Sequence, residues 1–261
     1  MGKADEDMVQ PVSLGKVEIG SGMPKVAVSI VGRSREEIVT KAQTLREMAV
    51  DVVEWRADYY AQAKELPCLL QTLAQVQIVL EDTPLLFTFR SQREGGEQAI
   101  SPDEYRKLNR AAASTAAVSA VDVEMFSEEA AELVRELHQA GKAVVGSYHD
   151  FRSTPPREEL RSRLLQMREM GADILKIAVT PHSRADVLRL LAVTAELSES
   201  GVEQPLVTMS TTGLGVVSRV CGELFGSAMS FGAVGACSAA GQLPVEQLRE
   251  VLHILHNNMK G

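Results

Sequence analysis

The stretch GADILKIAVTP, residues 171–181, combines the pattern of a buried strand with a lysine at its centre. Apolar residues flank Lys176 on both sides, as in a strand of a parallel sheet that is covered on both faces. Removing an ammonium group from water costs several kcal/mol unless the group is paired or neutralised. Lys176 therefore needs either a charged partner or a chemical role.

Short runs of the same β type recur along the chain and alternate with longer helical patterns. The predicted strands are 26–32, 52–58, 85–90, 120–125, 143–150, 174–179, 205–210 and 228–234. Capping boxes at Ser34–Glu37 and Ser101–Glu104 indicate helix starts, and the last helix begins near Pro244. Strict alternation of strand and helix predicts a parallel sheet with right-handed crossovers.

Eight such units predict an α/β protein with a closed (β/α)8 barrel, a TIM barrel, as a single domain over residues 1–261. An open doubly wound sheet is the alternative. Its glycine fingerprint is weak here, because GLGVVS (213–218) lacks the third glycine and follows the seventh strand. VSLGKVEIG (12–20) predicts a small N-terminal hairpin that closes the barrel bottom.

The composition excludes several classes of partner. The chain has a net charge of -8, and this argues against nucleic acid, whose phosphates need a basic face. No apolar run is long enough to span a membrane, and the polar N-terminus lacks the pattern of a signal peptide, so we expect a cytoplasmic protein. The three cysteines form no CxxC pair and suggest no metal framework, so we expect no bound metal.

Charged side chains recur towards the ends of the predicted strands. Alternate residues of a barrel strand point inward, and the active site lies at the carboxyl ends of the strands. The side chains that this alternation would bring together are Glu54, Arg56, Arg90, Asp122, Glu124, His149 and Lys176. A charge-balanced structural lattice is the alternative interpretation. Because branched apolar residues ordinarily fill a barrel, we favour a site for a polar substrate.

Lys176 and His149 together suggest Schiff-base chemistry. Desolvation and a nearby Arg56 or Arg90 would both disfavour the ammonium form of Lys176. A neutral amine can attack a ketone or aldehyde and form an imine. His149 ends the neighbouring strand, where an imidazole can move protons at neutral pH. A purely structural histidine is the alternative for that position.

Six motifs, in chain order, resemble the type I 3-dehydroquinate dehydratase family. They are VEWRAD, FTFRSQREGGE, SYHDF, ILKIAV, SRVCGELFGSAMSFG and SAAGQLP, and the resemblance runs from about residue 24 to the C-terminus. It implies a cytoplasmic, cofactor-free hydro-lyase with a barrel fold, a homodimer of the shikimate pathway to aromatic amino acids. The implied reaction converts 3-dehydroquinate to 3-dehydroshikimate and water.

The resemblance also implies roles for individual residues. Lys176 would form the imine with the C3 ketone. His149 would take the C2 proton and deliver it to the C1 hydroxyl in a syn elimination, with Glu94 orienting the imidazole. Arg219 would hold the substrate carboxylate. The remaining positions implied to bind the substrate or hold its network are Ser29, Glu54, Arg56, Arg90, Ser238 and Gln242, the last two on a closing loop.

Two positions depart from the family pattern. Ala240 stands where the family often has proline, and Thr211–Gly213 stands where it often has methionine-glycine. The first could loosen the closing loop, and the second changes the wall of the site. Neither is a proton-transfer residue.

Two other functions remain open from the residues themselves. A class I Schiff-base aldolase acting on a sugar phosphate would use the same electron flow. It would need a phosphate site after the last two strands, and Gly213, Gly215, Gly232 and Gly235 could supply one. A barrel retained as a binding or scaffold protein is the non-enzyme alternative, against which the presence of Lys176, His149 and Arg219 argues.

Overall fold

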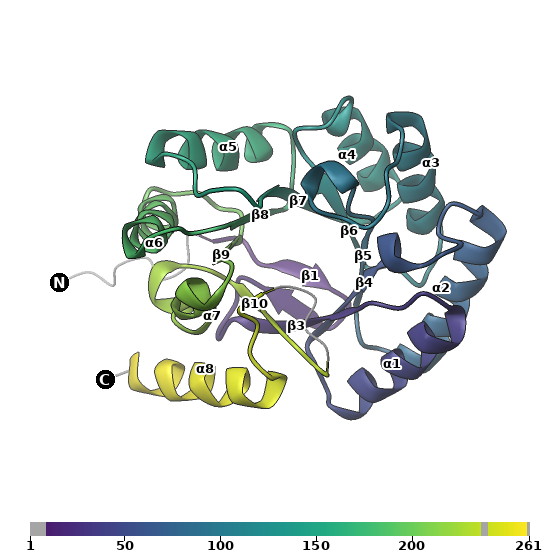
Figure 1. Cartoon of the computed structure of the whole chain (residues 1–261), viewed down its shortest axis with the longest axis horizontal. Helices are drawn as coiled ribbons and strands as arrows, with labels where there is room; N and C mark the ends of the chain where they lie inside the picture. The colour runs from purple at the N-terminus through teal and green to yellow at the C-terminus, as the bar shows by residue number, and fades with distance from the viewer. Residues whose placement is uncertain (1–8, 236–239, 260–261) are drawn as a thin grey trace.

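The computed structural model describes residues 9–235 and 240–259. The eight barrel strands are β3 (Lys25–Ile30), β4 (Val52–Arg56), β5 (Leu85–Thr88), β6 (Ala120–Glu124), β7 (Ala143–Asp150), β8 (Ile174–Val179), β9 (Leu206–Ser210) and β10 (Met229–Gly232). The helices that surround them are α1 (Arg35–Glu47), α2 (Leu66–Leu80), α3 (Pro102–Ala113), α4 (Ala130–Gln139), α5 (Arg157–Glu169), α6 (Arg184–Glu199), α7 (Val216–Val220) and α8 (Val245–Met259) (Figure 1). Each predicted strand is present, with ends that differ by at most two residues.

The strands pair in parallel and in chain order from β3 to β9, and β10 pairs with β3. Between β9 and β10, an isolated bridge joins Leu206 to Ser227, and the Ala228 N–H donates to the Leu206 carbonyl at 2.7 Å. The sheet is thus a nearly closed barrel, as predicted. The open doubly wound alternative is wrong, because the strand order contains no reversal.

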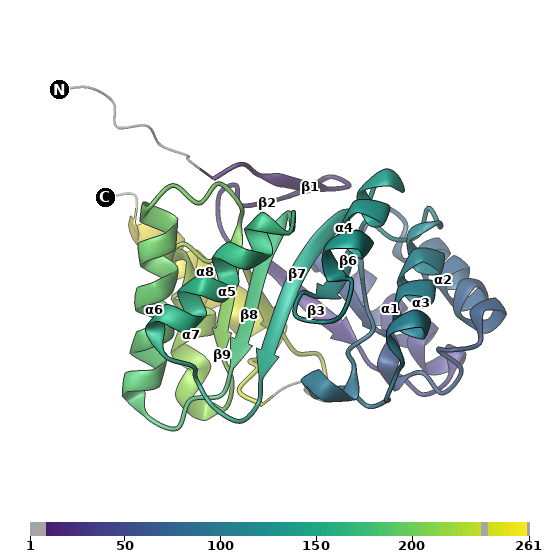
Figure 2. The same ribbon diagram turned by 90° about the horizontal axis from the view of Figure 1, so that it is seen from above.

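The N-terminal hairpin is also confirmed. β1 (Val12–Leu14) and β2 (Val17–Ile19) pair antiparallel and lie across the end of the barrel opposite the arrowheads of β7 and β8 (Figure 2). Leu14 and Ile19 are fully buried against inward-facing apolar residues such as Val52. The hairpin therefore closes the bottom of the barrel and leaves the carboxyl ends of the strands for the site.

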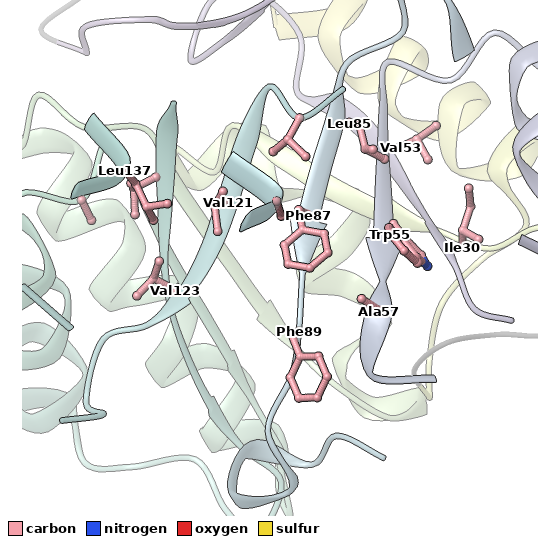
Figure 3. Packing of buried hydrophobic residues seen from close by; sticks show 14 of the residues in the cluster. Ile30, Val53, Trp55, Ala57, Leu85, Phe87, Phe89, Val121, Val123 and Leu137 are labelled. Carbon is pink, nitrogen blue, oxygen red and sulfur yellow. The ribbon is translucent and has the colours of Figure 1, made fainter. Parts of the chain in front are cut away.

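The main core lies between the strands and the helices around them. Trp55 and Phe87 point outward from β4 and β5, and their rings meet edge to face at 5.7 Å (Figure 3). Such pairs add to the free energy already gained by burying the rings. Among the described residues, no helix is both long enough and apolar enough to span a membrane.

The two predicted capping boxes have different outcomes. Ser101 and Glu104 form the full reciprocal pair at the start of α3. At α1, Ser34 accepts from the Glu37 N–H, but the Glu37 carboxylate accepts from the Arg33 N–H instead. The prediction of a capping box at Ser34 is therefore only half correct, because the preceding residue offers a competing donor.

Inward-facing residues change character along each strand. On β4 the inward series begins with Val52 in the lower apolar cluster and continues with Glu54 and Arg56, which line a cavity above it. On β8, Ile174 belongs to the same apolar cluster, and Lys176 follows two residues later. The barrel interior therefore consists of an apolar floor with a charged layer at the carboxyl ends of the strands.

Candidate active site

A cavity of about 310 Å³ lies above this floor, at the small end of the range for ligand pockets. The predicted site residues that line it are Ser29, Glu54, Arg56, Arg90, His149, Lys176, Arg219 and Gln242. Glu94 is buried beside His149 rather than in the cavity wall. Ser238 lies outside the described residues.

The environment of Lys176 differs from the expectation. The Nζ atom lies 3.0 Å from Asp122 Oδ2, 3.5 Å from Glu54 Oε1 and 4.8 Å from the centre of the Phe231 ring. Arg56 and Arg90, the expected cationic neighbours, line the same cavity, but the charged groups in direct contact with the Nζ atom are carboxylates. The alternation that brought Lys176 inward brought these acids inward as well, and they compensate the buried charge.

Arg90 joins Lys176 to the rest of the network through Asp122. The guanidinium contacts Asp122 Oδ1 at 2.6 Å, Ser147 Oγ at 3.0 Å and Glu124 Oε1 at 3.3 Å. Burial alone would raise the pKa of Asp122, but Arg90 and Lys176 together hold it below its ordinary value. Asp122 stays a carboxylate and orients both cations.

Glu54, the second carboxylate beside Lys176, is held by two hydroxyl groups. Ser29 Oγ donates to Oε2, and Thr88 Oγ1 donates to Oε1 at 2.9 Å. Ser29 lies directly opposite Glu54 in the β3–β4 register, so the parallel pairing brings them together. Ser29 thus acts on the site through Glu54 as well as through the cavity wall.

His149 and Glu94 form a hydrogen-bonded pair. Glu94, at the end of a 3-10 turn over Gln92–Glu94, places Oε2 3.0 Å from His149 Nδ1. The same oxygen accepts the main-chain N–H of His149 at 3.1 Å. An oxygen that already accepts one donor suits a second, so Nδ1 carries the hydrogen and Nε2 keeps its lone pair. The Phe151 ring stacks on the imidazole, with the two ring centres 6.0 Å apart.

Burial disfavours charge on both members of this pair. It lowers the pKa of His149 well below the ordinary value, and Arg90 and Lys176 add to the effect. Burial also raises the pKa of Glu94 to about 8, against the opposing influence of Arg90. One proton is therefore shared by the pair, and its loss leaves a carboxylate beside a neutral imidazole.

The other two arginines are held in different ways. Arg56 makes a bidentate contact with Asp58, with both N–O distances at 2.8 Å, and its guanidinium lies over the Tyr59 ring. Arg219, on the short helix α7, is 2% exposed, and one nitrogen lies 3.6 Å from the Met209 sulfur. Both bring positive charge to the wall of the cavity.

Several residues of the site received no role from the sequence. Ser147 and Thr88 lie two residues before His149 and Arg90, so the inward alternation could have found them. The residues of the cavity wall that were missed are Tyr59, Gly95, Phe151, Ala178, Thr180, Met209 and Phe231. Within residues 9–235 and 240–259, no cluster of three or more His, Cys, Asp or Glu side chains is arranged to hold a metal ion.

Comparison with known proteins decides between the possible families. Residues 26–259 match the family model described as type I 3-dehydroquinase. The chain belongs to this family. Among 3-dehydroquinate dehydratases, that of Listeria welshimeri is 47% identical over 94% of this chain and 98% of its own length. That of Salmonella choleraesuis is 44% identical over 95% of this chain and 99% of its own.

Solved structures of type I dehydroquinases have the same architecture. The 3-dehydroquinate dehydratase of Geobacillus kaustophilus superposes with a TM-score of 0.93 at 33% identity, covering 97% of this chain and 99% of its own. The Clostridium difficile enzyme, in a crystal structure with covalently modified comenic acid, gives a TM-score of 0.92 at 42% identity. That match covers 96% of this chain and 99% of the other.

Proposed function

We propose that this protein converts 3-dehydroquinate to 3-dehydroshikimate and water by syn elimination through a Schiff base on Lys176. One observation carries the proposal: the buried Lys176 and His149 line one cavity in a member of the type I dehydroquinase family. The product is a conjugated enone, so its ultraviolet absorbance gives a direct assay. No absorbance increase with the purified protein and 3-dehydroquinate would refute the activity.

The first step makes an electron sink. Lys176 gives up one ammonium proton, its amine attacks the C3 ketone, and the adduct takes up a proton again as its hydroxyl leaves as water, which forms an iminium ion. Deprotonation beside a ketone builds charge on oxygen and is slow, whereas an iminium accepts the electron pair as a neutral enamine. Asp122 and Glu54 lie within 3.5 Å of the nitrogen and are placed to balance the positive charge of the iminium.

The second step uses one imidazole twice. His149 Nε2 takes the proton from C2, and the enamine then expels the C1 hydroxyl, which leaves as water with the proton that His149 returns. Both transfers occur on one face of the ring, hence the syn geometry. While His149 is charged, the Glu94 carboxylate stabilises it through Nδ1. Water then hydrolyses the product imine and regenerates the amine.

Arg219→Ala is expected to weaken substrate binding more than turnover. Arg219 is proposed to hold the substrate carboxylate, a contact that exists in both the ground and transition states. We expect KM to rise by about 10–100-fold, as for the loss of a charge-assisted contact of roughly 1.5–3 kcal/mol. Steady-state kinetics measure this, with Arg219→Lys as the control that keeps the charge. A fall in kcat at constant KM would contradict the assignment.

Glu94→Gln is expected to change the pH below which kcat/KM falls, the acidic limb of the pH–rate profile. In the parent enzyme, the base form exists only after the pair has lost its shared proton. Because the pKa of Glu94 is raised to about 8, kcat/KM should fall as the pH drops below that value. Glutamine cannot take the proton, so the limb should move to lower pH, towards the lowered pKa of His149. An unchanged limb in pH–rate measurements would exclude this coupling.

The aldolase alternative has less support. Its phosphate site would use main-chain N–H groups after β9, but that of Thr212 donates to the Ala240 carbonyl and that of Gly215 donates to the Thr212 carbonyl. Turnover of a phosphorylated sugar at a rate similar to that of 3-dehydroquinate would favour it. The homodimer and the cytoplasmic location remain predictions from the family resemblance, and sedimentation of the purified protein tests the first.

A further inference from the structure

Thr212, one of the two threonines at the family departure, has an unusual backbone. Its φ of 62° and ψ of 176° fall in a region that is essentially confined to glycine, and a side chain there is strained. Such a conformation persists only where the surroundings impose it. The residue also lines the substrate cavity.

The neighbours of Thr212 are fixed on both sides. The Thr211 N–H donates to the Val179 carbonyl at 2.8 Å, and the Thr211 and Thr180 hydroxyls lie 3.0 Å apart, so Thr211 continues β9 alongside β8. After the turn, the Gly215 N–H donates to the Thr212 carbonyl at 3.1 Å. The change of direction is therefore confined to one residue, which must take a positive φ.

The strained residue faces the segment 240–242. Its N–H donates to the Ala240 carbonyl at 3.0 Å. A Cβ on Gly241 would lie 2.8 Å from the Thr212 carbonyl carbon and closer still to its oxygen, so the two backbones are in direct contact. Ala240 and Gln242, on either side of Gly241, both line the cavity. The position of Gln242 thus depends on the Thr212 backbone.

We infer that Thr212 is a positioning residue: the Thr212 backbone holds segment 240–242 in place so that Gln242 contacts the substrate. This inference rests on the proposed function of the cavity. The strain is imposed by the Thr211 and Gly215 anchors, and it directs the Thr212 N–H towards Ala240. Disturbing the contact between Thr212 and segment 240–242 should weaken substrate binding and leave the chemistry at Lys176 and His149 intact.

Gly241→Ala tests the contact between Thr212 and segment 240–242, because the added methyl collides with the Thr212 carbonyl. We expect KM to rise by about 10-fold and kcat to stay within about threefold. The matched control is Gly141→Ala, where φ is 71° and the space is open, so the backbone penalty is similar without the collision. If the two variants have the same KM, the positioning role of Thr212 is refuted.

A double-mutant cycle identifies Gln242 as the group that is positioned. In a Gln242→Ala background, Gly241→Ala should change KM by less than about twofold, because the contact it disturbs is already absent. Full additivity of the two changes would overturn the inference. If the parent protein itself does not dehydrate 3-dehydroquinate, the proposed function is wrong. That result is distinct from additivity of the two changes, which overturns only the positioning role of Thr212.

The strain has a separate readout that needs no activity. Thr212→Gly should raise Tm by about 2–4 °C, since glycine adopts the conformation without penalty. Thr212→Ser retains a Cβ and should leave Tm within about 1 °C of the parent. A fall in Tm for Thr212→Gly would refute the strain on which the positioning depends.

Discussion

Lys176→Ala is expected to lower kcat/KM by at least about 10⁴-fold, because the whole mechanism passes through the imine on this nitrogen. In the parent, borohydride with 3-dehydroquinate should leave an adduct of dehydrated-substrate mass on the peptide that contains Lys176. The variant should give no adduct. Peptide mass spectrometry measures both, and an adduct on any other lysine would overturn the inward orientation and the mechanism together.

Lys142 provides the matched control. Burial lowers its pKa, but its Nζ donates to the Thr115 and Val118 carbonyls outside the cavity. Lys142→Ala should keep activity within about twofold of the parent. A trapped adduct on Lys142 would show that imine formation does not need the cavity.

The folded state should tolerate the loss of Lys176 with a moderate decrease in stability. Asp122 keeps its contacts with Arg90 and Ser147, and Glu54 keeps those with Ser29 and Thr88. We therefore expect the free energy of unfolding to decrease by about 1–3 kcal/mol, the cost of leaving buried acceptors less well paired. Denaturant titration separates this effect from the loss of activity.

His149→Ala is expected to stop turnover while leaving imine formation possible. Loss of a general acid–base typically costs about 10²–10⁴-fold, and here one group serves two proton transfers, so kcat should fall by at least about 10²-fold. Borohydride should still attach the substrate to Lys176, because the amine remains. Trapping without turnover would place His149 after the imine.

The control for this variant is His138→Ala. The His138 ring contacts Asp173 at 2.8 Å on the surface, away from the cavity, and its loss should leave kcat unchanged. If His149→Ala keeps turnover within a few-fold of the parent, the imidazole is not the proton shuttle, and Glu94 becomes the candidate base. Loss of both trapping and turnover would instead indicate that His149 is needed for imine formation.

Periodicity in the sequence was enough to predict the barrel. Runs such as 174–179 are apolar apart from Lys176 because both faces of a barrel strand are covered, and the regular spacing of such runs predicts parallel pairing in chain order. The hairpin at 12–20 was predicted as well, and its strands alternate apolar and polar residues. Alternation along β4, β6 and β8 also predicted that the charged residues share one interior.

Only the tertiary structure decided how those charges pair. The sequence suggested cationic neighbours for Lys176, whereas Asp122 and Glu54 contact it, because strand register and side-chain length set which atoms meet. The hydrogen bond between Glu94 and His149 joins residues 55 positions apart, and no local pattern determines its geometry. The strain at Thr212 arises in the same way, because Thr211 is hydrogen-bonded to β8 on one side and the Gly215 N–H donates to the Thr212 carbonyl on the other. Local periodicity determines which residues face inward, and the three-dimensional packing of the strands and loops determines their partners.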